Sequence, residues 1–262
     1  STLRGRLQSG ANAYGIVLSV PSPVTARIAS TLGFDWACID MEHSPQSASI
    51  MAEMVAAITS SSSSCTPLVR VPSHSEEWIK WAVDAGAQGI VIPGVQNKDQ
   101  MWRLVSLCRS ATQSLSTPSA APPLFGHGRH RDSPDAAAVS SPSTAVVSDI
   151  MVIPQIESTD AVANIDDILS VHGVDAVFVR PQNLSSGHSP MLPAQMTGGA
   201  VSGSLGHVIR AARHFTIPLG IDCADGDAAR MRIQQGFQMV VVANDVDILA
   251  SAATDQLNRA RS

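Results

Sequence analysis

The sequence predicts an α/β protein, a (β/α)8 TIM barrel that forms a single domain over residues 1–262. Three observations lead to this fold. Eight short apolar runs alternate along the chain with eight longer segments of helical period. The runs are almost continuously hydrophobic, as in parallel strands that are covered on both faces. The length of 262 residues also suits one barrel of this kind.

The predicted strands are rich in Val and Ile, which strands favour. They are Tyr14–Val20, Trp36–Met41, Pro67–Val71, Gly89–Pro93, Met151–Glu157, Ala176–Arg180, Ile217–Asp222 and Met239–Asn244. The predicted helices are Pro23–Leu32, Ser47–Thr59, Ser75–Ala85, Lys98–Ser110, Asp160–Ser170, Ser202–His214, Gly226–Gly236 and Val246–Arg261. Acidic Glu76 and Glu77 suit a first helical turn, and Gly86 and Gly236 suit the residue after a helix end.

The count of eight units favours a closed barrel over an open doubly wound sheet, which needs no particular number of strands. No G-x-G-x-x-G segment follows the first predicted strand. This argues against a dinucleotide-binding protein, because that motif carries the phosphate-binding turn.

Bulk composition favours a globular protein with a large core. Hydrophobic residues make up 44% of the chain and charged residues 15%, so one large domain can bury enough apolar surface. The formal net charge of -5 argues against a surface for nucleic acid. Since no run of 18 apolar residues occurs either, we expect neither nucleic acid nor a membrane among the partners.

The cysteines point to a reducing compartment. Cys38, Cys65, Cys108 and Cys223 are scattered without C-x-x-C spacing. Cys38 and Cys223 lie inside apolar runs, where an unpaired cysteine packs as a small hydrophobic residue. Structural thiols without a signal-peptide pattern predict a cytoplasmic protein.

One region interrupts the alternation of strands and helices. Residues from about 110 to 147 are rich in Ser, Pro and Ala, which predicts a long insertion. The insertion joins a helix to a strand, so we expect it on the face opposite the active site.

Polar residues gather at the carboxyl ends of the apolar runs. In a barrel these ends converge on one mouth, where catalytic residues come from several strands. Polar groups are costly to bury without partners, so the grouping favours a functional site over a set of loop caps. The residues are Asp40, Glu42, His43, Arg70, Gln155, Glu157, Arg180, Asn183, Asp222, Asn244 and Asp245.

Four segments at these ends resemble the HpcH/HpaI aldolases, which are class II pyruvate aldolases. They are D-x-E-H from Asp40, V-R-V-P around Arg70, Q-I-E ending at Glu157, and P-x-x-L-S from Pro181. Each motif alone is weak, whereas four in this order at matching strand ends are specific. The resemblance runs from about Gly15 to about Leu249. The family includes a fungal branch with macrophomate synthase.

The resemblance implies a carbon–carbon lyase of the aldolase type that acts on a small 2-oxo acid through a pyruvate enolate. Arg70 would bind the carboxylate or keto oxygen of pyruvate and stabilise the enolate. His43, oriented by Asp40 and coupled to Asp84, would be the acid–base group. A guanidinium suits the charge that builds on the keto oxygen, and a histidine can shuttle the aldol hydroxyl proton near neutral pH.

The same resemblance implies a divalent metal, Mg²⁺ or Mn²⁺. Glu157 would be a metal ligand, and Gln155 would contact the substrate or a metal-bound water. Glu42 would act near the metal without binding it directly. A divalent cation in a dry site stabilises the negative charge of an enolate.

The chain departs from the family pattern in one segment. Relatives carry G-P-x-D-L-S, in which the aspartate is the second metal ligand; here Arg180 replaces the glycine and Asn183 the aspartate. Both replacements make the local charge more positive. Arg180, Pro181 and Gln182 are then expected to line the substrate site.

Three interpretations of this departure stay open. In the first, Asn183 still binds the metal through its carbonyl oxygen, and the metal is held tightly only with an anionic substrate. In the second, Arg180 turns inward, pairs with Glu157 and takes the place of the cation, so that the site is metal-independent. In the third, the site is degenerate and the protein binds a carboxylate without turnover.

The alternative activity is decarboxylation of oxaloacetate coupled to enolate capture, as in the macrophomate synthase branch. Decarboxylation generates the enolate directly, so it tolerates a weakened metal site better. The resemblance also implies a homo-oligomer, a trimer or a hexamer, in which the last helix is exchanged between subunits. The segment Val246–Arg261 is long enough for such an exchange.

Overall fold

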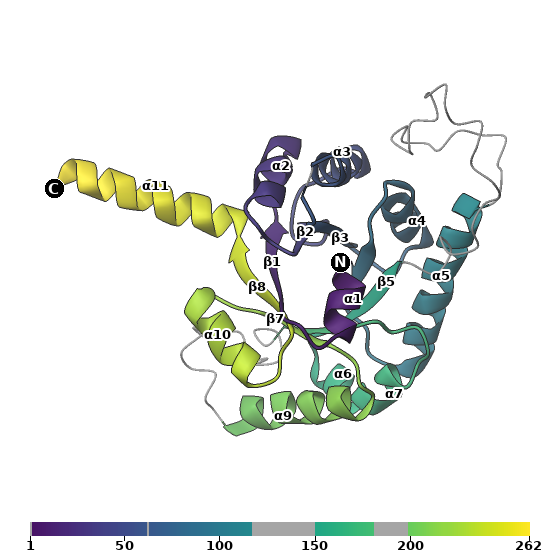
Figure 1. The fold of residues 1–262 in the computed structure, drawn as a ribbon. Coiled ribbons are helices and arrows are strands. Elements are labelled where there is room, and N and C mark those ends of the chain that lie inside the picture. Colours follow the sequence, from purple (N-terminus) through teal and green to yellow (C-terminus); the bar gives the residue numbers. More distant parts are fainter. Residues whose placement is uncertain (1, 62, 117–149, 181–198) are drawn as a thin grey trace.

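The computed structural model describes residues 2–61, 63–116, 150–180 and 199–262 of the chain. Its eight parallel strands close into a barrel in chain order, and β8 pairs with β1. This confirms the predicted (β/α)8 fold (Figure 1). The strands are β1 Ala13–Leu18, β2 Trp36–Asp40, β3 Thr66–Arg70, β4 Gly89–Ile92, β5 Met151–Ile156, β6 Val177–Val179, β7 Leu219–Asp222 and β8 Met239–Asn244.

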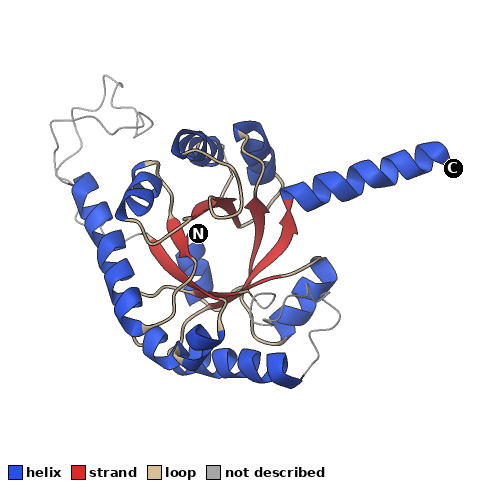
Figure 2. Cartoon of the chain, turned by 180° about the vertical axis from the view of Figure 1, so that it is seen from behind, coloured by secondary structure: helices blue, strands red, loops and turns tan. Residues whose placement is uncertain are grey.

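Helices surround the barrel (Figure 2). They are α1 Leu3–Gln8, α2 Pro23–Thr31, α3 Ala48–Thr59, α4 Glu76–Asp84, α5 Lys98–Ser116, α6 Thr159–Ala163, α7 Ile165–Leu169, α9 Gly199–His214, α10 Gly226–Gln234 and α11 Asp245–Arg261. The side chains of Ser22, Ser47, Ser75, Ser158 and Asp225 each accept a hydrogen bond from a backbone N–H in the first turn of a helix. Such caps satisfy donors that the helix itself cannot. They explain why these helices begin close to the predicted positions.

The predicted start of the insertion is wrong. Helix α5 continues through residues 110–116, because its added turn still faces the core: Ala111 and Thr112 are buried. The rest of the predicted insertion, residues 117–147, lies outside the described residues.

The predicted helix Asp160–Ser170 is also interrupted. Asn164 has φ -98° and ψ 14°, which ends α6 and begins α7. Its side-chain amide donates to the backbone oxygen of Gln96 at 2.8 Å. This contact with the loop before α5 accompanies the break between the two short helices.

Helix α1, which the apolar pattern did not predict, lies against the amino-terminal end of the barrel (Figure 1). Leu3 and Leu7 are buried in the same cluster as the side chains of the barrel interior. Arg4 forms an ion pair with Asp175 and donates to the backbone oxygen of Ile150 at 3.0 Å. The helix therefore closes the end of the barrel opposite the mouth.

Aromatic side chains fill the barrel interior above this plug. Trp36 and Phe178 pack edge to face with ring centroids 6.3 Å apart. Glycines on neighbouring strands make room for them: a Cβ on Gly15 would lie 2.0 Å from the Trp36 ring, and one on Gly220 would lie 2.5 Å from Phe178. The interior is thus packed with apolar groups, as in other barrels of this type.

Helix α11 extends away from the barrel in both views (Figures 1 and 2). Every residue of this helix after Asp245 is exposed. Within the described ranges, the helices are too short or too polar to span a lipid bilayer.

Replacing Gly15 by Ala should destabilise the protein, because the new Cβ would collide with the Trp36 ring. Overpacking of this kind costs about 1–3 kcal/mol. Gly203→Ala is a matched control, since no heavy atom lies within 4 Å of a Cβ added at this α9 position. This control should gain about 0.5–1 kcal/mol. Urea unfolding measures both, and wild-type stability of Gly15→Ala would contradict the packing.

Candidate active site

Strand register brings a carboxylate and a guanidinium together inside the mouth of the barrel. Asp40 at the end of β2 is directly opposite Arg70 at the end of β3. Arg70 Nε donates to Asp40 Oδ1 at 2.9 Å, and Nη2 donates to Oδ2 at 2.6 Å. Their side chains are 7% and 2% exposed, so the pair is bidentate and almost dry.

Both charges of this pair are stabilised. Burial alone would raise the pKa of Asp40, but the hydrogen bonds and charge of Arg70 outweigh it and hold that pKa below 3.8. The backbone N–H groups of Glu42 and His43 also donate to Asp40 Oδ1. Burial likewise opposes the charge of Arg70, while Asp40 raises the pKa of the guanidinium above its usual value. Arg70 is therefore a fixed cation.

A chain of hydrogen bonds runs from this pair across the mouth. Arg70 Nη1 donates to Gln155 Oε1 at 3.2 Å, and Gln155 Nε2 donates to Glu157 Oε2 at 2.8 Å. The backbone N–H of Gly94 donates to Glu157 Oε1 at 2.7 Å. The structure thus brings together four of the polar strand ends that the sequence expected to converge at the mouth, Asp40, Arg70, Gln155 and Glu157.

His74, in the loop after β3, supports this chain of hydrogen bonds. His74 Nε2 lies 2.7 Å from the backbone oxygen of Pro93, and the next residue is Gly94. Gly94 has a φ of +69°, a backbone conformation that residues other than glycine rarely adopt. His74 thereby anchors the turn whose N–H group holds Glu157.

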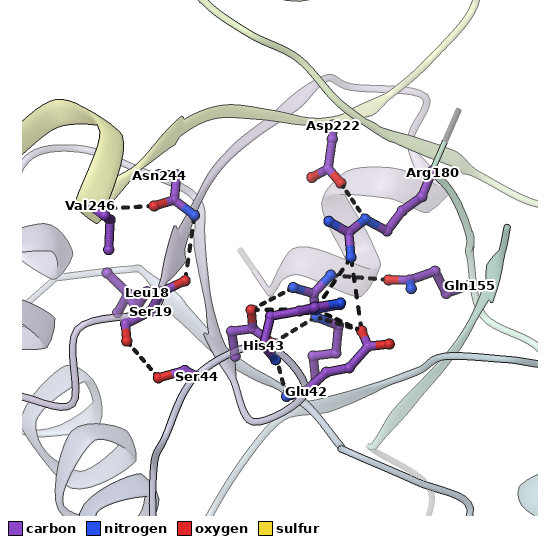
Figure 3. Close-up of polar contacts among 12 residues, drawn as sticks. Leu18, Ser19, Glu42, His43, Ser44, Gln155, Arg180, Asp222, Asn244 and Val246 are labelled. Atoms are coloured by element: carbon purple, nitrogen blue, oxygen red, sulfur yellow. Dashed lines mark hydrogen bonds and ion pairs between the residues drawn. The ribbon is translucent and has the colours of Figure 1, made fainter. Parts of the chain in front are cut away.

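Glu42 and His43 lie on the more exposed side of the pair, since their side chains are 19% and 53% exposed. Figure 3 shows the two next to each other. Glu42 Oε2 is 3.3 Å from Arg70 Nε and 3.3 Å from His43 Nδ1. Burial raises the pKa of Glu42 despite these positive neighbours. The His43 ring is 53% exposed and 3.9 Å from Asp40, so Glu42, rather than the predicted Asp40, is its nearest carboxylate.

Arg180 turns inward from the end of β6 (Figure 3). Its Nε lies 3.1 Å from Asp222 Oδ2, and its Nη1 lies 3.9 Å from Glu42 Oε2 and 3.5 Å from His43 Nδ1. Burial raises the pKa of Asp222. The inward turn matches the second interpretation, but among the described residues the ion pairs of Arg180 are with Asp222 and Glu42 and not with Glu157.

Asp222 was not among the predicted site residues, although it stood among the polar strand ends. Its signal was a single acidic residue closing the apolar strand β7. Only the barrel shows that it faces Arg180, because β6 and β7 are neighbours with Val179 opposite Ile221.

Asp84 does not join the site within one chain. It ends α4, which runs back from the mouth toward the amino-terminal end of the barrel, and it pairs with Lys80 at 3.2 Å. The predicted coupling of His43 to Asp84 is therefore absent from the described contacts of a single chain. Pro181, Gln182 and Asn183 lie outside the described residues.

Two other polar strand ends have structural roles. Asn244 caps α11 by accepting from the Val246 N–H. Asp245 is buried and accepts from the backbone N–H groups of Ser19 and Val20 at 2.8 and 3.0 Å. Both tie the start of α11 to the barrel rather than facing the chain of hydrogen bonds around Arg70.

A small cavity lies beneath the polar layer, between Arg70 and Trp36. Its volume of ≈ 10 Å³ holds about one water molecule. Cys38 lines it, and burial raises the pKa of this thiol to about 12, so the thiol stays protonated at neutral pH. A space of this size is too small for an organic acid, whereas the His43 side chain above Arg70 is 53% exposed.

Asp40, Glu42 and His43 could hold a metal ion, because their ligand atoms lie within 4.8 Å of one another. A cation there would compete with Arg70, which already engages both oxygens of Asp40. Glu157 is a second candidate, because a carboxylate oxygen is the kind of ligand that a hard cation prefers; among the described residues Gly94 and Gln155 donate to it.

Asp40→Asn should unfold more easily, because it leaves Arg70 buried without its charged partner. Breaking a buried ion pair in this way costs about 3–5 kcal/mol. Since folding lowers the pKa of Asp40, its contribution is present above pH 3.8 and is lost as pH falls through the folded pKa. Urea unfolding from pH 7 to about pH 3 should show that the difference in unfolding free energy between wild type and Asp40→Asn becomes smaller. A deficit independent of pH would contradict the ion pair.

Comparisons with known proteins agree with this geometry. The family model for HpcH/HpaI aldolase/citrate lyase matches residues 14–252. A hydroxypyruvate/pyruvate aldolase from Rhizorhabdus wittichii is 30% identical over 94% of this chain and 92% of its own length. The structure of a family member from Burkholderia cenocepacia is 28% identical, with a TM-score of 0.81 over 99% of both chains.

Macrophomate synthase shares the fold at 24% identity, with a TM-score of 0.79 over 99% of this chain and 89% of its own. The family match covers all eight strands except the first residue of β1. The chain therefore belongs to the HpcH/HpaI aldolase/citrate lyase family and is a carbon–carbon lyase of the aldolase type.

Proposed function

We propose that this lyase makes or breaks a carbon–carbon bond next to a small 2-oxo acid, through a pyruvate enolate. The observation that carries the proposal is the chain Asp40–Arg70–Gln155–Glu157 at the mouth, with His43 half-exposed above it. Hydrogen-bond donors that are already in place, in a site with little water, stabilise a developing oxyanion.

Arg70 stabilises the enolate oxygen in this proposal. Its Nε edge is engaged by Asp40, so the predicted two-oxygen grip on a substrate carboxylate cannot use that edge. The opposite edge, Nη1 and Nη2, has N–H groups left over, and Gln155 borders it. A keto oxygen that meets this edge gains a fixed cation as its charge grows.

His43 moves the proton of the aldol hydroxyl. Its Nδ1 faces both the Glu42 carboxylate at 3.3 Å and the Arg180 guanidinium at 3.5 Å. The Glu42 carboxylate can accept a hydrogen bond from Nδ1 when that nitrogen carries a proton. The Arg180 guanidinium can donate to Nδ1 when it does not. The exposed part of the ring is left for substrate or water.

For the metal, we propose Glu157 as a ligand and Asn183 as the second. A bound Mg²⁺ or Mn²⁺ would supply Lewis-acid stabilisation of the enolate charge. Activity measured in EDTA, and again after Mg²⁺ or Mn²⁺ is added, tests this. Full activity in EDTA would instead favour Arg180 as the cation at the mouth.

A second candidate function is decarboxylation of oxaloacetate with enolate capture. The inward Arg180 favours it, because a second guanidinium beside Arg70 suits a substrate with more negative charge than pyruvate. Release of pyruvate from oxaloacetate, compared with release from a 4-hydroxy-2-oxo acid, separates the two activities. Ligand binding without any turnover would favour a non-catalytic carboxylate-binding protein.

His43→Gln should lower kcat for pyruvate release from a 4-hydroxy-2-oxo acid about 10²–10⁴-fold, the usual contribution of an acid–base group. A coupled lactate dehydrogenase assay measures pyruvate. His172→Gln serves as control, since this histidine is exposed between α7 and β6. Loss of activity in the control, or wild-type kcat in His43→Gln, would rule out the proposed proton transfer.

We also propose a homo-oligomer, a trimer or a hexamer, that exchanges α11 between subunits. The support for this assembly is exposed apolar surface. Leu249 on α11 is 66% exposed, and Val24 and Ile28 on α2 form an exposed stripe with Leu32, the residue that caps this helix. The cytoplasm is the proposed location, since all four cysteines are free thiols.

Deleting residues 246–262 should therefore give a smaller particle in size-exclusion chromatography with light scattering. The conservative change Asp255→Asn on the same helix should leave the mass unchanged. A full-length chain that is monomeric at micromolar concentration would refute the exchange.

A further inference from the structure

The guanidinium groups of Arg70 and Arg180 both lie at the mouth, and they differ in how many N–H donors remain without a partner among the described residues. Arg70 is 7% exposed and spends three nitrogens on Asp40 and Gln155. The Arg180 side chain is 18% exposed. Within the described part of the chain, its Nη2 has no hydrogen bond or ion-pair partner. Arg180 is thus the guanidinium that is more open to an incoming anion.

Arg180 is also held in place without being used up. Asp222 engages Nε at 3.1 Å, while Glu42 and His43 border Nη1. A guanidinium has five N–H donors in a planar fork, so a carboxylate can still bind at the remaining edge. The ion pair with Asp222 orients that edge before any ligand arrives.

The positions of the two guanidinium groups favour this use. Arg70 is matched by Asp40, which leaves Arg180 between the carboxyl groups of Asp222 and Glu42. Glu42 Oε2 lies within 4 Å of both Arg70 Nε and Arg180 Nη1. Because the two guanidinium groups border the same carboxylate oxygen, one short molecule can touch both.

We propose that Arg180 binds a second carboxylate of the substrate, so that this lyase prefers 2-oxo acids with two carboxylates over those with one. The inference rests on the proposed function and names its substrate class. The 2-oxo acid end meets the free edge of Arg70, and the distal carboxylate meets Nη2 of Arg180. Asp222 is the positioning residue that holds Arg180.

Two stable ligands that differ by one carboxylate test this proposal. Malate and lactate share the 2-hydroxy acid group, and only malate has the second carboxylate. Calorimetry on the full chain, in EDTA and again with Mg²⁺, should give wild-type protein at least about tenfold tighter binding of malate, or about 1.4 kcal/mol. Equal affinities for the two ligands would overturn the proposal.

Variants at Arg180 then locate the preference. Arg180→Gln should weaken malate binding at least about tenfold and change lactate binding less than about twofold. Arg180→Lys keeps the charge but loses the fork, so it should retain part of the preference. Arg230→Gln is the matched control, since Arg230 is 76% exposed on α10 and its ion pair among the described residues is with Asp227. Equal losses for both ligands in Arg180→Gln and Arg180→Lys would overturn the proposal.

A separate readout distinguishes this failure from failure of the proposed function. Exchange of the methyl protons of pyruvate with deuterated water requires enolate formation but no second carboxylate. Exchange together with equal malate and lactate affinities would leave the lyase proposal standing and remove the role of Arg180. No exchange together with a malate preference that Arg180→Gln abolishes would do the reverse.

Discussion

The bidentate ion pair between Asp40 and Arg70 organises the mouth of the barrel. It forms because β2 and β3 are neighbours in a register that puts the two residues side by side. In a nearly dry site each charge depends on the other, since an unpaired buried charge is very costly. The orientation of the guanidinium then sets Gln155, and Gln155 sets Glu157. The contact between β2 and β3 thus also orients the side chains at the end of β5.

The same pair determines how the site can meet an anion. Asp40 takes the Nε edge of Arg70, so Arg70 offers a charge and a narrow outer edge rather than a full two-oxygen grip. A second guanidinium, on Arg180, lies farther out and is balanced by Asp222. The mouth therefore has an inner cation that is almost buried and an outer cation that is more exposed. Glu42 lies between them and contacts both.

The apolar floor keeps this chemistry at the mouth. Trp36 and Phe178 fill the barrel, and Gly15 and Gly220 let them approach the neighbouring strands. The gap that remains below Arg70 holds about one water molecule. Helix α1 closes the far end with Leu3 and Leu7. Charged groups are consequently confined to one layer, where water is scarce and electrostatic contacts are strong.

The sequence by itself determined the barrel and the composition of its polar layer. Apolar runs of strand length, repeated eight times, leave few folds open, and the residues that close the runs must converge in a closed barrel. Asp40, Arg70, Gln155 and Glu157 close such runs, and hydrogen bonds connect the four in the structure. Helix α1 escaped prediction because a six-residue helix has too short a pattern to identify. The end of α5 was misplaced because burial, not composition, decides how far a helix continues.

Only the tertiary structure decided which polar groups pair with which. A one-dimensional pattern shows that Arg180 and Asp222 end strands, but not that Arg180 turns toward Asp222 and Glu42 rather than Glu157. It also cannot show that Asp84 pairs with Lys80 on its own helix, because a motif gives no direction in space. Partner choice depends on distances of a few ångströms between residues far apart in the chain. Those distances follow from barrel register and side-chain packing, which exist only once the strands have closed.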